Sequence, residues 1–370
     1  MDYQHGKISI WLAMSMVILG TGLMAHVLSL PVILNIAGRD SWVSVLLAAP
    51  FFILWIFIYF KMIHRLKRQS IIDWLEKQWG KTATWGMKII FSAILFFNAF
   101  YTVIDTMMWT NSTYLQQTPV FVVALCMMLL CVWMAYSGLQ SIAIVSSILL
   151  PLVILLGYFV SFSNVKFKDF TLLFPIFDNG YTPAIHGSFY VLASLFDIWI
   201  VLLFSHNVKK TFTNVQLFFF ALFFLMMVLG PITGAISEFG PTEALKQRHT
   251  TFDQWKILSL GQLMQHVDFL SIYQWLSGAI VRTAISIYLM IDVFQLKKNK
   301  SRLILLSILS VIMFSLLFFQ WRDDLMLLLM QHIYFPSLFV FVLMLTIAVL
   351  VTQWIIKRKE NKKHESQHES

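Results

Sequence analysis

The chain has 370 residues, of which 59% are hydrophobic and 12% are charged, and its mean hydropathy is +0.76. These values exclude an ordinary soluble domain and indicate a polytopic membrane protein. The net charge of +9 does not call for a nucleic-acid partner, because the basic residues gather in segments between apolar runs, as in loops that face anionic lipid. The partner that composition predicts is the lipid bilayer.

The first apolar segment, Ile8 to Asn35, contains no Lys, Arg, Asp or Glu, and the triplet Gly20-Thr21-Gly22 falls near its middle. A span needs about 20 apolar residues, and unpaired backbone groups in lipid cost several kcal/mol each. A helix-weakening triplet at mid-depth therefore predicts a break where free backbone amides line a cavity. Discontinuous helices of this kind form binding sites in transporters.

Ten spans result when boundaries are placed at charge clusters, Pro, Gly and polar turns. They are Ile8 to Asn35, Trp42 to Phe60, Ile89 to Trp109, Val120 to Tyr136, Ser141 to Phe162, Ile185 to Ser205, Val215 to Ser237, Phe269 to Phe294, Leu303 to Phe319 and Tyr334 to Ile356. The weakest boundaries are the polar stretch ending at Pro119 and residues 137–140. We expect residues 1–356 to form one transmembrane domain and 357–370 a disordered cytoplasmic tail.

Lys and Arg are unevenly distributed over the connecting segments. If the N-terminus is cytoplasmic, 19 of the 27 lie on the inner side, seven on the outer side and one, Arg282, within a span. This bias predicts that both termini are cytoplasmic. In the second long outer loop, Glu238 to Asp268, apolar residues fall at roughly helical spacing, namely Phe252, Trp255, Leu258, Leu263 and Val267. They favour either a short helix on the membrane surface or a packed re-entry loop.

Two ionisable residues fall near mid-depth. At about 1.5 Å per residue, Asp197 lies roughly 18 Å along the sixth span and Arg282 roughly 20 Å along the eighth. A charge at the bilayer centre costs at least about 2.5 kcal/mol, so we expect both to face the protein interior. They either pair, or bind a zwitterionic ligand whose carboxylate is held by the amides of Gly20 to Gly22. The alternative is an ion pair that only fixes helix packing.

Other polar residues in the spans have simpler interpretations. Asp105 falls near the outer end of the third span and Asp292 near the inner end of the eighth, so both are expected at the interface. His26 follows the expected break, where a neutral histidine bonded to a neighbouring helix is typical. It is also a candidate pH-sensitive group.

Motifs for other chemistry are missing from the sequence. It contains no P-loop, no His-Glu-x-x-His and no nucleophile elbow, so ATP-driven transport and hydrolysis are not indicated. Cys126 and Cys131 lie in one apolar run without metal-ligand spacing and are expected to pack as small apolar residues. We therefore predict no cofactor, no metal and no catalytic residue.

Short motifs occur in a characteristic order. They are Gly20-Thr21-Gly22, Leu30-Pro31, Ala37-Gly38-Arg39-Asp40-Ser41-Trp42, Phe174-Pro175-Ile176-Phe177-Asp178-Asn179-Gly180 and Arg248-His249-Thr250-Thr251-Phe252-Asp253. With them the chain resembles the B subunit of spore germinant receptors, a family similar to permeases of the amino acid, polyamine and organocation superfamily. The resemblance covers nearly the whole chain.

The resemblance implies an all-α fold with a five-plus-five inverted repeat, roughly residues 8–162 and 185–356, in which spans one and six are broken. It also implies assembly with an A subunit and a lipoprotein C subunit in the inner membrane of a spore. One departure is that the sixth span has Gly187 and Ala193-Ser194 but no central Gly-x-Gly or Pro. Its unwinding is therefore implied only by the resemblance.

Three function classes remain. The first is a non-enzymatic receptor subunit that binds a small nutrient, expected to be an amino acid, and passes a conformational bias to its partners. Its expected ligand site comprises Gly20, Thr21, Gly22, Ala193, Ser194, Asp197 and Arg282. The second is a proton-coupled amino-acid permease that uses the same cavity. The third is a membrane transferase with His26 as base, which needs a second polar partner that the sequence does not show.

The resemblance favours the receptor subunit. Sodium-driven relatives of this fold often hold a cation in the groove between spans one and eight. Arg282, on span eight, would place a fixed positive charge there. The sequence therefore predicts a protein that works without sodium.

Overall fold

The computed structural model describes residues 7–258, 267–296, 298–319 and 321–368, with side chains described as far as Asn361. Within these ranges the chain is helical, without strands, and Ile8 and Val208 form one isolated bridge. Nine of the described helical runs are long and apolar enough to cross a membrane. The chain is therefore an all-α polytopic membrane protein, as its composition predicts.

The helices are α1 (Ile10–Leu23), α2 (Leu30–Ala37), α3 (Ser41–Arg65), α4 (Ile71–Thr113), α5 (Val120–Ser137), α6 (Leu139–Ser163), α7 (Thr182–Leu195), α8 (Val201–Phe204), α9 (Asn214–Phe239), α10 (Pro241–Ala244), α11 (Thr250–Lys256), α12 (Leu270–Asp292), α13 (Asn299–Leu317), α14 (Asp323–Leu329) and α15 (Phe335–His368). Helical turns of other kinds connect several of them. A π-helix, Met24–Leu28, links α1 to α2, a 3₁₀ segment, Phe196–Ile200, links α7 to α8, and a π-helix, Met330–Tyr334, links α14 to α15.

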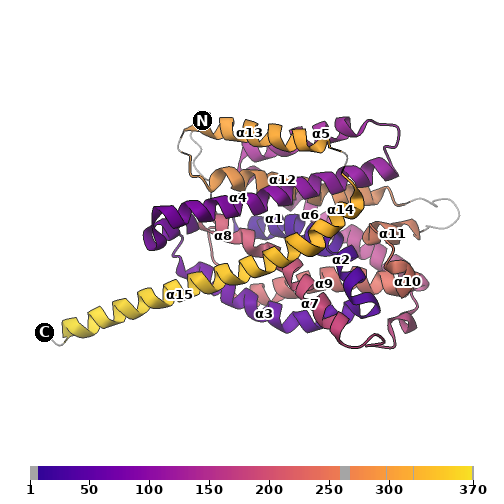
Figure 1. Cartoon of the computed structure of the whole chain (residues 1–370), viewed down its shortest axis with the longest axis horizontal. Helices are drawn as coiled ribbons and strands as arrows, with labels where there is room; N and C mark the ends of the chain where they lie inside the picture. The colour runs from indigo at the N-terminus through magenta and orange to yellow at the C-terminus, as the bar shows by residue number, and fades with distance from the viewer. Residues whose placement is uncertain (1–6, 259–266, 297, 320, 369–370) are drawn as a thin grey trace.

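The first membrane-crossing run, Ile10–Arg65, contains the first two expected spans. Gly38 separates them with φ 58°, a left-handed conformation that glycine adopts without strain. The chain turns there, because α1 and α2 run from left to right in Figure 1 whereas α3 runs back toward the left. Two of the ten expected spans therefore lie in one continuous helical run.

The two weakest boundaries were placed correctly. The helix α4 ends at Thr113 and α5 begins at Val120, and Gly138, with φ 92°, separates α5 from α6. The last span differs, because its helical run begins at Asp323 and not at Tyr334. At its other end α15 remains helical to His368, where the sequence predicts a disordered tail.

The spans that carry the two mid-depth charges lie innermost. In the most apolar windows of Thr182–Asn207 and Leu270–Asp292, 83% of the residues are buried, compared with 17% in Asn299–Leu317. Figure 1 shows α1 within the bundle beside α12 and α6, whereas α5 and α13 form its upper edge. Exposed apolar side chains on the outer helices face the bilayer, so polar groups gather at the centre.

The expected break at Gly20-Thr21-Gly22 is in the wrong place. The helix α1 continues to Leu23, so the amides of the triplet are bonded within the helix and are not free. The irregularity follows as the π-helix Met24–Leu28 and Ser29. Gly20 serves close packing, because a Cβ atom there would lie 3.5 Å from Cα of Arg282 on α12.

The sixth span is irregular but not unwound. The helix α7 ends at Leu195, and the chain tightens into the 3₁₀ segment Phe196–Ile200 before α8. This outcome fits the lack of a central Gly-x-Gly or Pro, since nothing in the sequence favours an open backbone there. The inverted repeat stays a prediction.

The loop after α9 packs against the bundle. Its helix α11 buries Phe252 and Trp255, which are 3% and 1% exposed. Trp109 and Tyr114 meet Phe252 edge-on at ring distances of 5.4 and 5.9 Å. Of the two interpretations of this loop, the packed one is therefore correct for the described residues; Leu263, one of the apolar positions, lies outside them.

Candidate functional site

Asp197 and Arg282 form a direct ion pair inside the bundle, as the sequence predicts. Asp197 lies in the 3₁₀ segment after α7, and Nη1 of Arg282 on α12 donates to its Oδ2. The side chains are 0% and 2% exposed. Each charge is therefore compensated by the other where lipid and protein exclude water.

Three further residues complete the polar cluster. Arg282 donates through Nη2 to Oδ1 of Asn98 at 2.8 Å and through Nε to Oγ1 of Thr102 at 3.2 Å. Nδ2 of Asn98 donates to Oδ1 of Asp197 at 3.2 Å. The hydroxyl of Tyr334 donates to Oδ1 of Asn98 and lies 3.4 Å from Oδ1 of Asp197. All three guanidinium nitrogens thus have acceptors, which offsets part of the cost of burying the cation.

The triplet on α1 joins this cluster through a carbonyl and not through amides. Nη1 of Arg282 donates to the carbonyl oxygen of Gly20 at 3.1 Å. Gly22 lies against Met227, and its carbonyl oxygen is 2.6 Å from Nδ1 of His26. The expected anion-binding amides are thus replaced by a carbonyl that solvates the guanidinium.

The remaining predicted ligand-site residues are buried but form no hydrogen bond to the cluster among the described residues. Thr21 is buried, and its Oγ1 has no hydrogen-bond partner among the described residues. Ser194 is buried and donates to the carbonyl oxygen of Val191 at 2.8 Å. Ala193 is 1% exposed. His26 bonds to its own helix and not to a neighbouring one, while Thr251 donates to the His26 carbonyl oxygen at 2.7 Å.

A second charged cluster corrects the interpretation of Asp105 as a solvated helix end. Asp105 is 1% exposed and accepts from Nη2 of Arg248 at 2.6 Å. Arg248 also donates through Nε to Asp323 at 2.9 Å, so it joins α4 to the start of α14. Burial alone lowers the pKa of Arg248, but Asp105, Tyr101 and Asp323 outweigh it and raise that pKa. Asp105 is therefore a buried member of an ion-pair cluster and not a solvated helix end.

The motifs that carry the resemblance contact one another. Oδ1 of Asp40 accepts from the amide of Phe177 at 3.0 Å, and Arg39 lies 3.3 Å from Asp178. The ring of Trp42 meets Phe174 edge-on. Sequence order alone gave no indication of these pairings.

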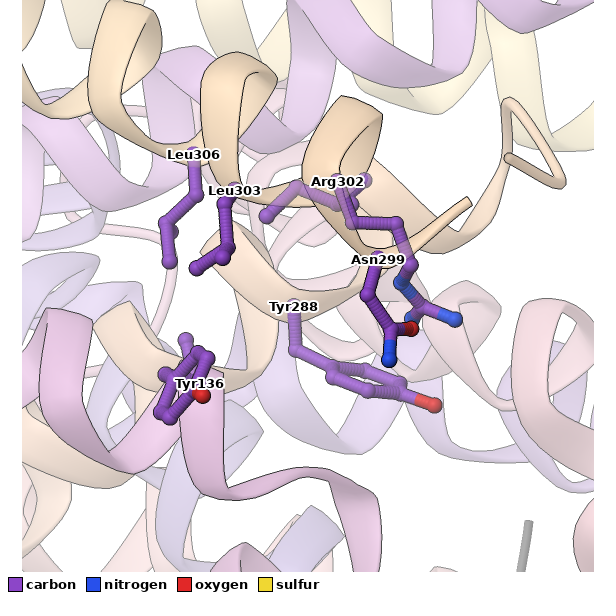
Figure 2. A pocket seen from close by; sticks show the side chains of 8 residues that line it. Tyr136, Tyr288, Asn299, Arg302, Leu303 and Leu306 are labelled. Carbon is purple, nitrogen blue, oxygen red and sulfur yellow. The ribbon is translucent and has the colours of Figure 1, made fainter. Parts of the chain in front are cut away.

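A cavity of about 60 Å³ lies apart from both clusters, between α5, α12 and α13. Figure 2 shows Tyr136 and Tyr288 on one side of it and Asn299 and Arg302 on the other. Arg302 lies 3.5 Å from Asp292, whose side chain is 15% exposed. Asp292 is the last residue of α12, and its interfacial place stays a prediction. No group of three metal-ligating side chains occurs in the described part of the chain.

Sequence reasoning missed Asn98, Thr102 and Tyr334. For the first two a signal was present, because Asn98, Thr102 and Asp105 follow the i, i+4, i+7 spacing of one helix face in an otherwise apolar span. That polar stripe predicts a face turned toward other polar groups. Tyr334 was placed at a span end because the start of the last span was set too late.

The fold and its buried ion pair define an integral membrane protein whose central spans are joined by polar contacts inside the bundle. The chain belongs to the spore germination protein family of permeases, whose family model matches residues 7–324. It is similar to spore germination protein XB of Bacillus anthracis, with 33% identity over 348 residues, which cover 94% of this chain and 98% of that protein.

Proposed function

We propose that this chain is the membrane subunit of a spore germinant receptor that binds a small nutrient, expected to be an amino acid, and triggers germination through partner subunits. The observation that carries the proposal is the buried Arg282–Asp197 pair, in which Asp197 lies where its span departs from regular α-helix. Membership of the spore germination family supports the same process. The proposed partners are an A subunit and a lipoprotein C subunit, in the spore inner membrane, with both termini of this chain cytoplasmic.

A zwitterionic nutrient matches the pair because it carries both charges. Its carboxylate would replace Asp197 on Arg282, and its ammonium group would replace Arg282 on Asp197. Charge-assisted hydrogen bonds of this kind contribute about 1.5 to 3 kcal/mol each. Thr21 offers a buried hydroxyl without a partner among the described residues, which is available to such a ligand. Gly20, Gly22, Ala193 and Ser194 are the remaining residues of the proposed ligand site.

Exchange of the internal pair for a ligand would change the contacts between the spans. Asp197 lies in a 3₁₀ segment, and Gly20 precedes the π-helix Met24–Leu28 by a few residues. Segments of 3₁₀- and π-helix inside a helical run often mark functional hinges or sites. A ligand that binds one arrangement more tightly shifts the population toward it, and partner subunits can detect the change.

The experiment is a charge swap in spores. The double variant Asp197→Arg with Arg282→Asp is compared with the wild type for germination in response to amino acids and for the amount of receptor in the membrane. We expect the swap to restore assembly relative to either single variant but to abolish the response. A matched swap at the edge of the bundle, Asp292→Arg with Arg302→Asp, is expected to keep the response. Full recovery of the response by the central swap would show that the pair only fixes helix packing and does not bind the nutrient.

A proton-coupled amino-acid permease is the second candidate, favoured by the same buried pair. Transport of an amino acid across the membrane distinguishes the permease from the receptor subunit. Amino-acid uptake into proteoliposomes that rises with a proton gradient indicates the permease, whereas ligand-induced stabilisation of the purified chain without uptake indicates the receptor subunit.

A further inference from the structure

A larger cavity lies between α1, α6, α9, α11 and α12, and none of its lining residues belongs to the Arg282 cluster. Its volume is about 190 Å³. An engineered cavity of about 150 Å³ is large enough to bind benzene. The space therefore suits a molecule of one small ring or a short chain with one polar group.

The lining of this cavity excludes a charged ligand. The described residues that line it include no Asp, Glu, Lys or Arg, and their polar side chains include those of His26, Thr251, Gln254 and Gln274. An ion without a counter-charge in such surroundings would lose its hydration without compensation. The occupant is therefore neutral, unlike the zwitterion proposed for the Arg282 cluster.

Most polar groups of the lining are already bonded. Nε2 of Gln254 donates to the Pro231 carbonyl oxygen at 2.8 Å, and Nε1 of Trp255 donates to Oε1 of Gln274 at 3.2 Å. Thr251 donates to the carbonyl oxygen of His26. These bonds fix the polar end of the cavity in place.

His26 supplies an acceptor. Its Nδ1 lies 2.6 Å from the carbonyl oxygen of Gly22, which can only accept, so Nδ1 carries the proton of the neutral ring. Nε2 is then a lone-pair acceptor, and it has no recorded partner among the described residues. His26 lines the cavity, so an occupant that donates a hydrogen bond can pair with this nitrogen.

The route of entry is through the hydrocarbon. Tyr158 on α6 and Met226 on α9 both line the cavity and are 56% and 52% exposed on the surface of the bundle. Both helices are membrane-crossing runs, so this surface faces lipid. A ligand that enters here first dissolves in the bilayer, which again favours a neutral molecule with an apolar body.

We propose that this cavity is a binding site for a small neutral amphiphile, such as an aromatic or short aliphatic alcohol, whose hydroxyl donates to Nε2 of His26 while its apolar body packs against α6 and α9. The site is separate from the proposed nutrient site. A molecule bound there would contact His26 and so stabilise the π-helix Met24–Leu28, in which His26 lies.

The test is thermal unfolding of the purified full chain in detergent, titrated with benzyl alcohol, toluene and phenylalanine. A ligand that binds only the folded protein raises the Tm in a saturable manner. Two variants fill the cavity, Gly230→Leu and Val153→Phe, the first at a position where a Cβ atom would meet nothing within 4 Å. The matched control is Gly86→Leu on α4, which also meets open space and does not line the cavity. Any effect of the alcohol on the detergent micelle is the same for this control variant as for the filled variants.

We expect benzyl alcohol to raise the Tm of the wild type and of Gly86→Leu, and to have no saturable effect on either filled variant. Toluene stabilises less than benzyl alcohol, and His26→Phe removes that difference because it removes the acceptor. Equal shifts in the filled variants and the control would overturn the proposal. Equal stabilisation by toluene and benzyl alcohol in the wild type would also overturn it, by indicating a site for hydrocarbon chains. A rise in Tm with phenylalanine that persists in the filled variants indicates binding at the nutrient site. It is consistent with a cavity that accepts only neutral molecules.

Discussion

Arg248 and Asp105, 143 residues apart in the sequence, meet where Nη2 of Arg248 lies 2.6 Å from Oδ1 of Asp105. The contact joins the segment before α11 to α4. Arg248 also binds Asp323 at the start of α14 and lies 3.3 Å from the hydroxyl of Tyr101 on α4, so it connects three regions of the chain. His249 stands beside it, with its ring edge-on to Trp275. This cluster closes the end of the bundle that holds α10 and α11 (Figure 1).

Replacing Arg248 with Ala leaves the buried Asp105 carboxylate without its cation. Breaking a buried pair from one side costs about 3 to 5 kcal/mol, so we expect a clear fall in the Tm of the detergent-purified chain. Arg322→Ala is the matched control, because the Arg322–Asp324 pair is exposed to solvent and should leave the Tm unchanged. An equal fall in both variants would contradict this role for Arg248.

Thr102→Val removes the acceptor of Nε of Arg282 while keeping the shape of the side chain. A buried donor without a partner costs about 1 to 3 kcal/mol, so the variant should unfold at a lower temperature than the wild type. Thr110→Val on the same helix is the control, because the Thr110 hydroxyl bonds only to the Thr106 carbonyl oxygen in the recorded contacts. If both variants lose the same stability, the bond to Arg282 contributes nothing of its own.

Gly20 is expected to tolerate one methyl group but not a large side chain. A Cβ atom there lies 3.5 Å from Cα of Arg282, which is ordinary contact, so Gly20→Ala should fold normally. Gly20→Leu overpacks the contact between α1 and α12, at a cost of about 1 to 3 kcal/mol or more. Folded yield and Tm measure both effects, with Gly86→Leu as the control. Normal stability of Gly20→Leu would show that the two helices need not approach so closely.

Ligand binding is expected to be independent of sodium, because the Arg282 guanidinium already lies against the Gly20 carbonyl oxygen between spans one and eight. The check is the amino-acid concentration that gives half-maximal thermal stabilisation, measured in sodium chloride and in choline chloride. The two values should agree. A ligand shift seen only with sodium would contradict the prediction.

Asp197→Asn is expected to weaken the amino-acid response without preventing insertion. Loss of one charge-assisted bond of about 1.5 to 3 kcal/mol corresponds to a rise of roughly 10- to 150-fold in the half-maximal amino-acid concentration. Germination of spores carrying the variant gives the readout, with Asp292→Asn as the control at the edge of the bundle. An unchanged response would place the nutrient elsewhere.

The sequence predicted correctly those features that depend on burial in a bilayer of fixed thickness. Hydropathy and the positions of Gly138 and Pro119 gave the membrane class and most span boundaries, because lipid imposes the same length and polarity on every span. The same constraint placed Asp197 and Arg282 at mid-depth and facing inward, since an unpaired charge cannot remain in hydrocarbon.

Only the tertiary structure decided which groups meet at a given depth. The Gly20 triplet packs against α12 and does not open the helix, and Asp105 is covered by Arg248. Asn98 and Tyr334 enter the central cluster from α4 and from the π-helix before α15. A one-dimensional pattern records how deep a residue lies but not its rotation about the helix axis or the neighbour it faces, and these depend on the packing of all the spans together.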